Sequence, residues 1–508
     1  MLRGGGATVV VRKTNDGPVR GRRPVPGVLA FLGIPYAAPP FGPDRFREPR
    51  PVRPWEGVRA CHEFGPIAPQ SAQLPGAPSW SPGDEDILTL NIWAPSSDNG
   101  PLPVLVWIHG GAYTFGSSAQ PDFDGTALAG AGVIVVTFNY RLGFEGFGHL
   151  PAGDASPYPD NRGLLDQIAA LRWVRDNIAA FGGDPANVTV AGQSSGAASA
   201  ACLMVMDRAR GLFRRVIAHS VVGPCHSTEL AAETTRKVAA AAGVPVTAAD
   251  LVSTAPHTLV AASDHVVDHY RRHPASGSRH YDPVIYGPVV DGDTLPCDPL
   301  STTALGAARE VDLLVCHTTH EYWLLDAVGS SARVTTDAQL AIFARDFGLP
   351  DTLVPGYRAL MPHAPVLDIY LAILGDMAFT EYSNRLAEQH ALAGGRSFLS
   401  RFARRRGGPQ EAVHAWHCAD IPFAFGNLTA TGAEFLIGGP PNTADHQLSR
   451  RMVDAWVRFA TDGNPGWPPL DGSANTLRTW VTSDSTAPPS AGAVRDLWRR
   501  AGFPLQRP

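Results

Sequence analysis

A strand-like run that passes straight into a serine framed by glycines constrains this chain of 508 residues more than any other feature. Residues 188–191 are Val-Thr-Val-Ala, residues 192–196 are Gly-Gln-Ser-Ser-Gly, and small residues continue a helix-like pattern to Met206. Gly-x-Ser-x-Gly alone fits an ordinary turn, but between a strand and a helix it predicts a nucleophile elbow. In that turn the side chain of Ser194 stands clear above a sheet, at a helix N-terminus that favours negative charge.

Apolar strands alternate with helices along the chain. Residues 103–108 and 133–139 have the length and composition of fully buried strands, and residues 164–181 carry apolar side chains at helical spacing. Further strand-like runs occupy residues 86–93, 216–220, 312–316 and 396–402. This alternation predicts an α/β fold, in which a large and mostly parallel central sheet is covered on both faces by helices.

No repeat or linker divides the sequence, so residues 1–508 are expected to form a single domain. Residues 7–58 alternate β-like runs with turns, and their prolines favour an antiparallel edge that leads into the sheet. Residues 323–395 are helix-rich by pattern and are expected to pack as a cap beside the serine. The pattern continues with a docked helix at 450–461 and a tail rich in Pro, Gly and Ala at 483–508.

Composition excludes several kinds of partner. The 42 basic and 47 acidic residues give a formal charge of −5 without a basic block of the kind that binds nucleic acid. No apolar stretch reaches the length of about 18 residues that a membrane span needs. Residues 1–6 lack the apolar core of a secretory signal and lead into the strand-like residues 7–11, and the six cysteines are scattered. We therefore expect a cytoplasmic, disulfide-free protein without nucleic-acid or membrane partners, while its oligomeric state stays open.

A second glycine-rich turn, His109-Gly110-Gly111-Ala112-Tyr113, follows the strand at 103–108. Taken alone it fits a tight turn, but its place before the serine turn favours a loop whose bare N–H groups face an oxygen. The donors would be Gly111, Ala112 and Ser195, the residue after the serine. A serine nucleophile needs such donors, together with an imidazole that takes its proton and an acid that orients the imidazole.

Motifs spread along the chain occur together in one family. They occupy residues 31–40, 45–46, 85–91, 107–113, 161–167, 181–185, 192–196, 417–427 and 456–468. By these motifs the chain resembles, from about residue 8 to about residue 480, the type-B carboxylesterases, a cholinesterase-related family that includes bacterial para-nitrobenzyl esterases. The resemblance implies the α/β-hydrolase fold and a serine hydrolase of small-molecule carboxylic esters that works without a cofactor or a metal.

The resemblance also selects the acid. Residues 313–321 are similar to the family's strand and acid-bearing loop, so Glu321 takes the place of the catalytic glutamate. His320 and Tyr322 replace the aspartate and glycine that flank it in the family. A shift by one residue is the alternative, although Glu321 is the only carboxylate in that loop before Asp326.

For the base, residues 417–423 resemble the family's histidine loop, so His417 is expected to take the proton of Ser194. His414 is nearby and is expected to be a surface or loop histidine. The chain order Ser, Glu, His is the one that α/β-hydrolases use. The implied catalytic triad is Ser194, Glu321 and His417.

A few further positions carry information by their match to the family or their departure from it. Ser220 matches a serine that supports the acid through a hydrogen bond in relatives. Gln193 replaces a glutamate, whose negative charge would favour a protonated His417 and attract cations, so choline-type substrates are disfavoured. Ser195 replaces an alanine and is either inert or a competitor for hydrogen bonds. Ile87 replaces a cysteine of many relatives, so the familiar N-terminal disulfide cannot form.

The sequence leaves the substrate open. The aromatic residues beside the motifs are candidates for an apolar pocket, with core packing as an equal alternative: Tyr113, Phe115, Trp323 and Phe423. The shape of that pocket also depends on residues 65–82 and 323–395. The same machinery would serve for amides and carbamates or for acyl transfer to an alcohol, and the acyl and alcohol groups are not specified.

Two other interpretations are weaker. Family members that lost catalysis act as binding modules, but these typically lack the serine or carry a secretory signal. A metal site would use Cys316, His317, His320 and Glu321, which are all of ligand type. A strand end cannot aim four such neighbouring side chains at one ion, so no metal is expected.

Overall fold

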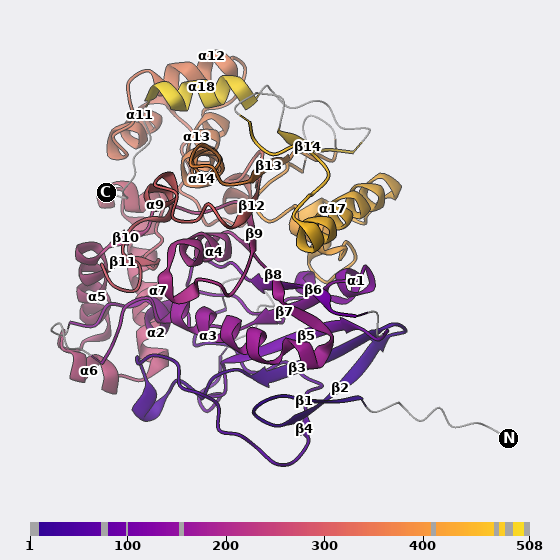
Figure 1. Cartoon of the computed structure of the whole chain (residues 1–508). Helices are drawn as coiled ribbons and strands as arrows, with labels where there is room; N and C mark the ends of the chain where they lie inside the picture. The colour runs from indigo at the N-terminus through magenta and orange to yellow at the C-terminus, as the bar shows by residue number, and fades with distance from the viewer. Residues whose placement is uncertain are drawn as a thin grey trace.

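The structure is a computed structural model that describes residues 10–72, 80–97, 100–151, 157–407, 413–471, 477–482 and 491–501. Within these residues a sheet of twelve strands has the order β1-β2-β3-β5-β7-β6-β8-β9-β12-β13-β14, with β4 beside β2, and β10 and β11 pair separately. Figure 1 shows helices on both sides of the large sheet. The strands are β1 (Val10–Lys13), β2 (Pro18–Val25), β3 (Val28–Pro35), β4 (Arg59–Ala60), β5 (Thr89–Pro95), β6 (Leu102–Ile108), β7 (Ile134–Phe138), β8 (Gly183–Gln193), β9 (Arg215–His219), β10 (His226–Ser227), β11 (Val289–Val290), β12 (Asp312–Thr318), β13 (Ser397–Phe402) and β14 (Arg478–Trp480).

The helices fill the connections between these strands. They are α1 (Thr126–Gly130), α2 (Gly143–Phe147), α3 (Arg162–Asn177), α4 (Ser195–Val205), α5 (Thr228–Ala242), α6 (Ala248–Ser253), α7 (Pro256–Arg272), α8 (Ser278–Tyr281), α9 (Pro299–Ala304), α10 (Trp323–Ala327), α11 (Asp337–Asp346), α12 (Leu353–Leu360), α13 (Val366–Gly375), α14 (Glu381–Leu392), α15 (Ile421–Phe425), α16 (Ala433–Ile437), α17 (Thr443–Asp462) and α18 (Ala491–Ala501). A short π-helix, η6 (Asp376–Thr380), joins α13 to α14.

The central strands run parallel. Strand β6 is parallel to both β7 and β8, and the parallel pairing continues from β8 through β9, β12 and β13 to β14. Strands β1, β2, β3, β5 and β7 pair antiparallel in that order and form the other part of the sheet. The predicted α/β fold with a mostly parallel sheet is confirmed. Parallel strands end at the same edge, so the turns after β6, β8, β9 and β12 are brought together there.

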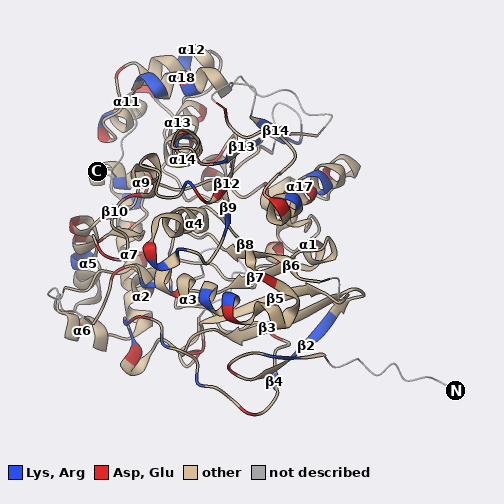
Figure 2. Ribbon diagram, viewed as in Figure 1, with Lys and Arg blue, Asp and Glu red and all other residues tan. Residues whose placement is uncertain are grey.

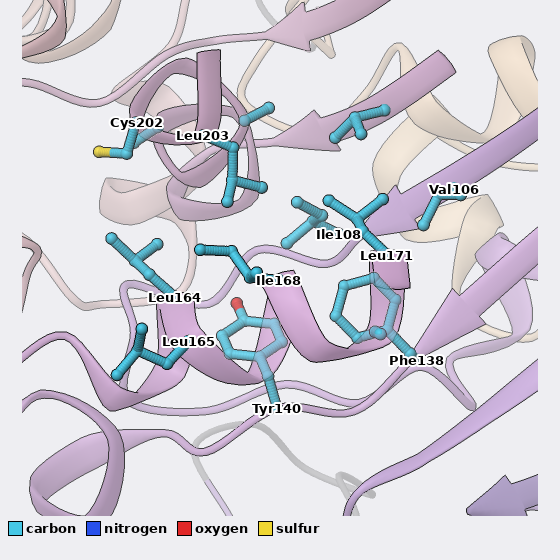
Figure 3. Packing of buried hydrophobic residues seen from close by; sticks show 14 of the residues in the cluster. Val106, Ile108, Phe138, Tyr140, Leu164, Leu165, Ile168, Leu171, Cys202 and Leu203 are labelled. Carbon is cyan, nitrogen blue, oxygen red and sulfur yellow. The ribbon is translucent and has the colours of Figure 1, made fainter. Parts of the chain in front are cut away.

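Successive side chains of the buried strands pack on opposite faces. Val106 and Ile108 of β6 belong to one hydrophobic cluster with Ile168 of α3 and Leu203 of α4. Figure 3 shows these side chains between the strands and the two helices. This face carries the helix that follows Ser194, so its packing fixes the height of that helix above the sheet.

The opposite face is covered by α17. Trp107, between Val106 and Ile108 in β6, has its ring 4.9 Å from the ring of Phe425 and 5.8 Å from that of Trp456. Helix α17 spans 443–462 and is therefore longer than the predicted helix at 450–461. An Asn442 cap accounts for the earlier start, because its side chain accepts a hydrogen bond from the backbone of Asp445.

The helix-rich pattern of residues 323–395 corresponds to α10, α11, α12, α13 and α14. Tyr382 and Leu386 of α14 pack in a cluster of the main sheet, whereas the other four helices contribute to a separate hydrophobic cluster. Helix α18 also joins this cluster through the fully buried Trp498, and it lies across α12 in Figure 1. The sequence pattern indicated only a tail at 483–508; apart from α18, that tail lies outside the described residues. The same holds for residues 7–9 of the strand expected at 7–11 and for 73–79 of the loop 65–82.

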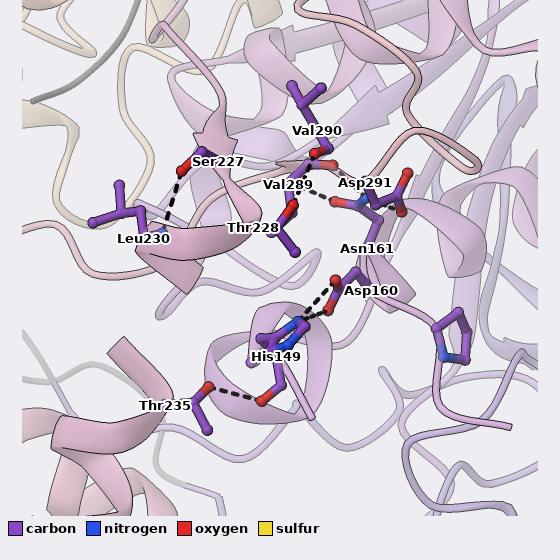
Figure 4. Close-up of polar contacts among 12 residues, drawn as sticks. His149, Asp160, Asn161, Ser227, Thr228, Leu230, Thr235, Val289, Val290 and Asp291 are labelled. Atoms are coloured by element: carbon purple, nitrogen blue, oxygen red, sulfur yellow. Dashed lines mark hydrogen bonds and ion pairs between the residues drawn. The ribbon is translucent and has the colours of Figure 1, made fainter. Parts of the chain in front are cut away.

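A polar network ties the start of α3 to the small β10–β11 sheet (Figure 4). Asn161 has a left-handed backbone with φ of 58°, and its side chain accepts a hydrogen bond from the N–H of Val289 at 2.7 Å and donates to the carbonyl of Val289 at 2.8 Å. Thr235 of α5 donates to the carbonyl of His149 at 2.7 Å. Backbone N–H and C=O groups outside the main sheet thus have side chains as hydrogen-bond partners.

Charge is dispersed over the surface. Figure 2 shows basic and acidic residues interspersed along α3, α5 and α17 in that view, which agrees with the small formal charge of −5. Among the described residues, none of the helices combines the length and the apolar character needed to span a membrane.

Candidate active site

Ser194 occupies a sharp turn between β8 and α4. Its φ of 57° and ψ of −125° are unusual for a residue with a side chain. Such strain costs about 1–3 kcal/mol and persists only where the surroundings impose it. The N–H of Ser194 donates to the carbonyl of His219 at 2.9 Å, which anchors the turn to β9. A methyl group on Gly196 would lie 2.1 Å from the carbonyl oxygen of Ile108, so only glycine allows helix and sheet to approach this closely.

A Gly196→Ala substitution is therefore expected to lower the free energy of unfolding by about 3 kcal/mol, because backbone atoms must move to admit the methyl group. The matched control is Gly130→Ala in α1, where a methyl group would meet no atom within 4 Å. The control is expected to be neutral or slightly stabilising. Urea denaturation followed by fluorescence compares the two, and equal midpoints would contradict this account of the turn.

The loop after β6 lies against this turn. Gly111, Ala112 and Tyr113 have positive φ values of 122°, 51° and 59°, and a methyl group on Gly110 would lie 3.1 Å from Cβ of Ser194. In the part of the chain that the structure describes, the N–H groups of Gly111, Ala112 and Ser195 have no hydrogen-bond acceptor. Backbone N–H groups without an acceptor are the kind of donor that an oxyanion needs.

Glu321 lies just beyond β12, and its carboxylate is fully engaged. Oε1 accepts hydrogen bonds from the hydroxyl of Ser220 and from the N–H of Thr318, each at 2.7 Å, and Oε2 lies 2.6 Å from Nδ1 of His417. Glu321 is 2% exposed. The carboxylate is therefore held in one orientation with a single oxygen facing the imidazole.

His417 is reached from a distant part of the chain. A parallel bridge between His320 and Trp416 joins its loop to the loop of Glu321, and the N–H of His417 donates to the carbonyl of Glu321 at 3.2 Å. Nε2 of its ring lies 2.9 Å from the side-chain nitrogen of Gln193, the residue before Ser194. Sequence spacing did not indicate this contact between Gln193 and His417.

Phe379 is another neighbour of the imidazole that the sequence did not single out. Its ring centroid lies 4.3 Å from that of His417, and the π-helix η6 carries it there. Such π-turns occur often at functional sites. No periodic pattern marks Phe379, because a π-turn departs from the helical repeat on which sequence interpretation depends.

Asp376, at the start of the same π-helix, is an unusual carboxyl. Burial raises its pKa from 3.8 to about 7, although the hydroxyl of Tyr357 donates to it at 2.5 Å and opposes the shift. Trp498 of α18 in turn donates to the hydroxyl of Tyr357 at 2.7 Å. The C-terminal helix thus supports the turn that brings Phe379 to the imidazole.

A raised carboxyl pKa means that the folded protein binds this proton more tightly than the unfolded chain does. The stabilisation is complete below about pH 4 and is lost as the pH rises towards 7. Asp376→Asn is expected to remove this dependence, so that the wild type loses about 3 kcal/mol relative to the variant between pH 4 and pH 7. Thermal unfolding of both proteins across this range measures the difference, and parallel pH curves would contradict the assignment.

A second buried pair of a histidine and a carboxylate, His219 and Asp420, lies near the site. Nδ1 of His219 is 2.6 Å from a carboxylate oxygen of Asp420, and the indole N–H of Trp456 points to Nε2 of His219 at 3.3 Å. Cys316 adds a third group of ligand type within 4.8 Å. The direct bond between His219 and Asp420 joins β9 to the loop of His417, three residues from the imidazole, and is a structural link that sequence patterns did not reveal.

The remaining histidines and thiols near the site are kept uncharged by burial. Burial lowers the pKa of His414 to about 4 and that of His320 well below its ordinary value. Burial also raises the pKa of the Cys418 thiol, next to His417, well above 9.0. Cys418 is therefore a poor nucleophile, since the reactive form is the thiolate.

The aromatic candidates for a pocket have different surroundings. Tyr113 is 4% exposed and its ring lies 4.5 Å from that of Phe147, while Phe423 is fully buried with its ring 5.2 Å from that of Phe402. Both belong to hydrophobic clusters. The half-buried residues are Phe115, in the loop after β6, and Trp323, whose ring lies 4.9 Å from that of His320.

Comparisons with known proteins identify the family of this chain. A family model described as the carboxylesterase family matches residues 8–488. The para-nitrobenzyl esterase of Bacillus subtilis (strain 168) is 36% identical over 466 residues, covering 87% of this chain and 89% of that protein. The phenmedipham hydrolase of Pseudarthrobacter oxydans is 32% identical over 456 residues, covering 86% of this chain and 87% of that protein.

The similarity extends to solved structures. The crystal structure of the carboxylesterase EST55 of Geobacillus stearothermophilus at pH 6.2 superposes with a TM-score of 0.83 at 35% identity, covering 96% of this chain and 99% of that chain. A thermophilic PNB esterase gives a TM-score of 0.81 at 34% identity, with coverages of 93% and 96%. The chain belongs to the carboxylesterase family and is a carboxylic ester hydrolase.

Proposed function

We propose that the protein cleaves small-molecule carboxylic esters through an acyl-enzyme formed on Ser194, with His417 as general base and Glu321 as the acid that orients it. The observation that carries the proposal is the 2.6 Å contact between Nδ1 of His417 and the carboxylate of Glu321, made beside the turn that holds Ser194. A carboxylate can only accept, so the imidazole proton stays on Nδ1 and Nε2 is left as the basic atom.

The reaction then has two halves with balanced proton transfers. The hydroxyl of Ser194 gives its proton to Nε2 of His417 while its oxygen attacks the ester carbonyl, and the N–H groups of Gly111, Ala112 and Ser195 stabilise the oxyanion. The bond to the alcohol breaks, and the alcohol leaves with the proton from His417. Water next gives a proton to His417 and attacks the acyl group, and the proton returns to Ser194 as the carboxylic acid departs.

Ser220 supports the acid in this proposal. Its hydroxyl donates to Glu321 at 2.7 Å, which stabilises the charged carboxylate and leaves the other oxygen for His417. We also assign residues 323–395 the role of a cap, since this region carries Phe379 to the imidazole ring. The cap and the catalytic residues would then form one domain.

Turnover of matched substrates tests the bond type. The p-nitrophenyl ester and the p-nitroanilide of one small acyl group are compared with a p-nitrophenyl carbamate of similar size under the same conditions. The expected order places the ester first by at least about tenfold in kcat/KM, with a burst of p-nitrophenol that marks acyl-enzyme formation. Faster turnover of the carbamate or anilide would favour the second candidate.

That second candidate is the same machinery acting on amides or carbamates, or passing the acyl group to an alcohol. This second candidate is supported by the name of one relative, phenmedipham hydrolase, which does not describe an esterase. We further propose a cytoplasmic location, which is supported by the free thiols of all six cysteines. Titration of six thiols in protein purified without reductant checks that proposal.

A further inference from the structure

Two contacts define the state of the His417 imidazole. Nδ1 lies 2.6 Å from the carboxylate of Glu321, and Nε2 lies 2.9 Å from the side-chain nitrogen of Gln193. A carboxylate only accepts hydrogen bonds and an amide nitrogen only donates them. Nδ1 therefore carries the proton and Nε2 is the bare acceptor. Both neighbours select the same neutral tautomer, which is the one that a general base needs.

The Gln193 amide, however, uses the lone pair that the reaction requires. Neutral imidazole has one in-plane lone pair at Nε2, and Ser194 has to donate into it to become a nucleophile. Ser194 and His417 are both described residues, and no hydrogen bond joins the hydroxyl to the imidazole. The hydroxyl of Ser194 and the amide of Gln193 are therefore competitors for a single acceptor.

Gln193 is held in this position by its surroundings. It is the last residue of β8 and is 4% exposed. Its side-chain oxygen lies against Gly110, where an added methyl group would be 2.8 Å away. The ring of Phe379 packs on His417 at 4.3 Å, so the imidazole has little freedom to turn from the amide.

We propose that Gln193 is a positioning residue that restrains the base: in the substrate-free enzyme its amide occupies Nε2 of His417, and it has to rotate away before Ser194 can transfer its proton. The inference rests on the proposed roles of Ser194 and His417. It assigns to Gln193 an effect opposite to that of an ordinary supporting residue. Removing the amide makes the resting serine more reactive.

The rate constant for phosphonylation of Ser194 by a small fluorophosphonate tests this directly, because the reagent reacts in one step and needs no deacylation. Gln193→Met keeps the length of the side chain and removes its donor. The expected result is a rate constant about three- to tenfold higher than that of the wild type. This ratio corresponds to the net free energy of one neutral hydrogen bond. The matched control is Gln167→Met in α3, another buried glutamine, which donates to Ser199 at 3.1 Å. The control is expected to stay within about twofold of the wild type.

Gln193→Glu provides an independent measurement and decides the matter if the Met variant does not fold. A carboxylate cannot donate to Nε2 and instead accepts from the protonated ring, so it favours the imidazolium form. Phosphonylation at neutral pH is expected to be slower than in the wild type. The midpoint of its pH profile is expected to rise by about one unit or more. A side chain at position 193 that did not face the imidazole would leave this midpoint unchanged.

The outcomes separate this inference from the proposed function. A wild-type protein that is phosphonylated at Ser194, together with a folded Gln193→Met variant that reacts at the same rate or more slowly, would overturn the role of Gln193 alone. An unchanged midpoint in Gln193→Glu would do the same. A wild-type protein that is not modified at Ser194 would contradict the proposed function itself.

Discussion

Replacing Ser194 with alanine is expected to lower kcat on p-nitrophenyl acetate by roughly 10⁴- to 10⁶-fold, because the variant has no oxygen to attack the ester carbonyl. The fold should survive, since alanine keeps the N–H that donates to the carbonyl of His219. Steady-state kinetics measures the loss, and circular dichroism with a thermal melt checks that the variant is folded.

A matched control lies one turn further along α4. Ser199 is a buried serine whose hydroxyl contacts the hydroxyl of Tyr113 at 3.4 Å, and it takes no part in the proposed reaction. Ser199→Ala is expected to retain turnover within about threefold of the wild type. Retention of wild-type turnover by Ser194→Ala would remove Ser194 from the mechanism.

Replacing Glu321 with glutamine is the second large effect, with an expected loss of roughly 10⁴-fold in kcat. The glutamine side chain can turn its nitrogen towards Nδ1 of His417, which then becomes an acceptor and leaves the proton on Nε2. That tautomer cannot accept the proton of Ser194. Binding of the substrate does not involve this contact, so KM should change much less than kcat.

Asp376→Asn serves as the control for this prediction, because it changes another buried carboxyl of the same region by the same chemistry. Its kcat is expected to stay within about tenfold of the wild type. A Glu321→Gln variant that also stayed within tenfold would show that the imidazole is oriented by another group. The one-residue shift considered for the acid loop would then need a different carboxylate.

The fold was predictable where local pattern and burial agree. The apolar run of β6 permits little else than a buried strand, and α3 has an apolar face that matches its packing on the sheet. Helix α18 was not predicted, because its eleven residues acquire a core only through α12 and the cap. The segment rich in Pro, Gly and Ala before α18 also indicated an irregular tail, so the helical spacing of Val494 and Trp498 did not predict a helix.

The candidate site divides in the same way. The turn at Ser194 and the loop at Gly111 are local, so spacing and glycine placement indicated them directly. Glu321 and His417 are 96 residues apart, and only the family resemblance singled them out. The contact of Gln193 with His417 depends on how two loops meet after folding, which no local pattern encodes.

The most direct test of the account is the site of covalent modification by a fluorophosphonate, read by peptide mass spectrometry. A single adduct on Ser194 is expected, with none in the Ser194→Ala variant and a much slower reaction in a His417→Ala variant. An adduct on another residue of the wild type, with Ser194 unmodified and ester turnover abolished, would contradict it.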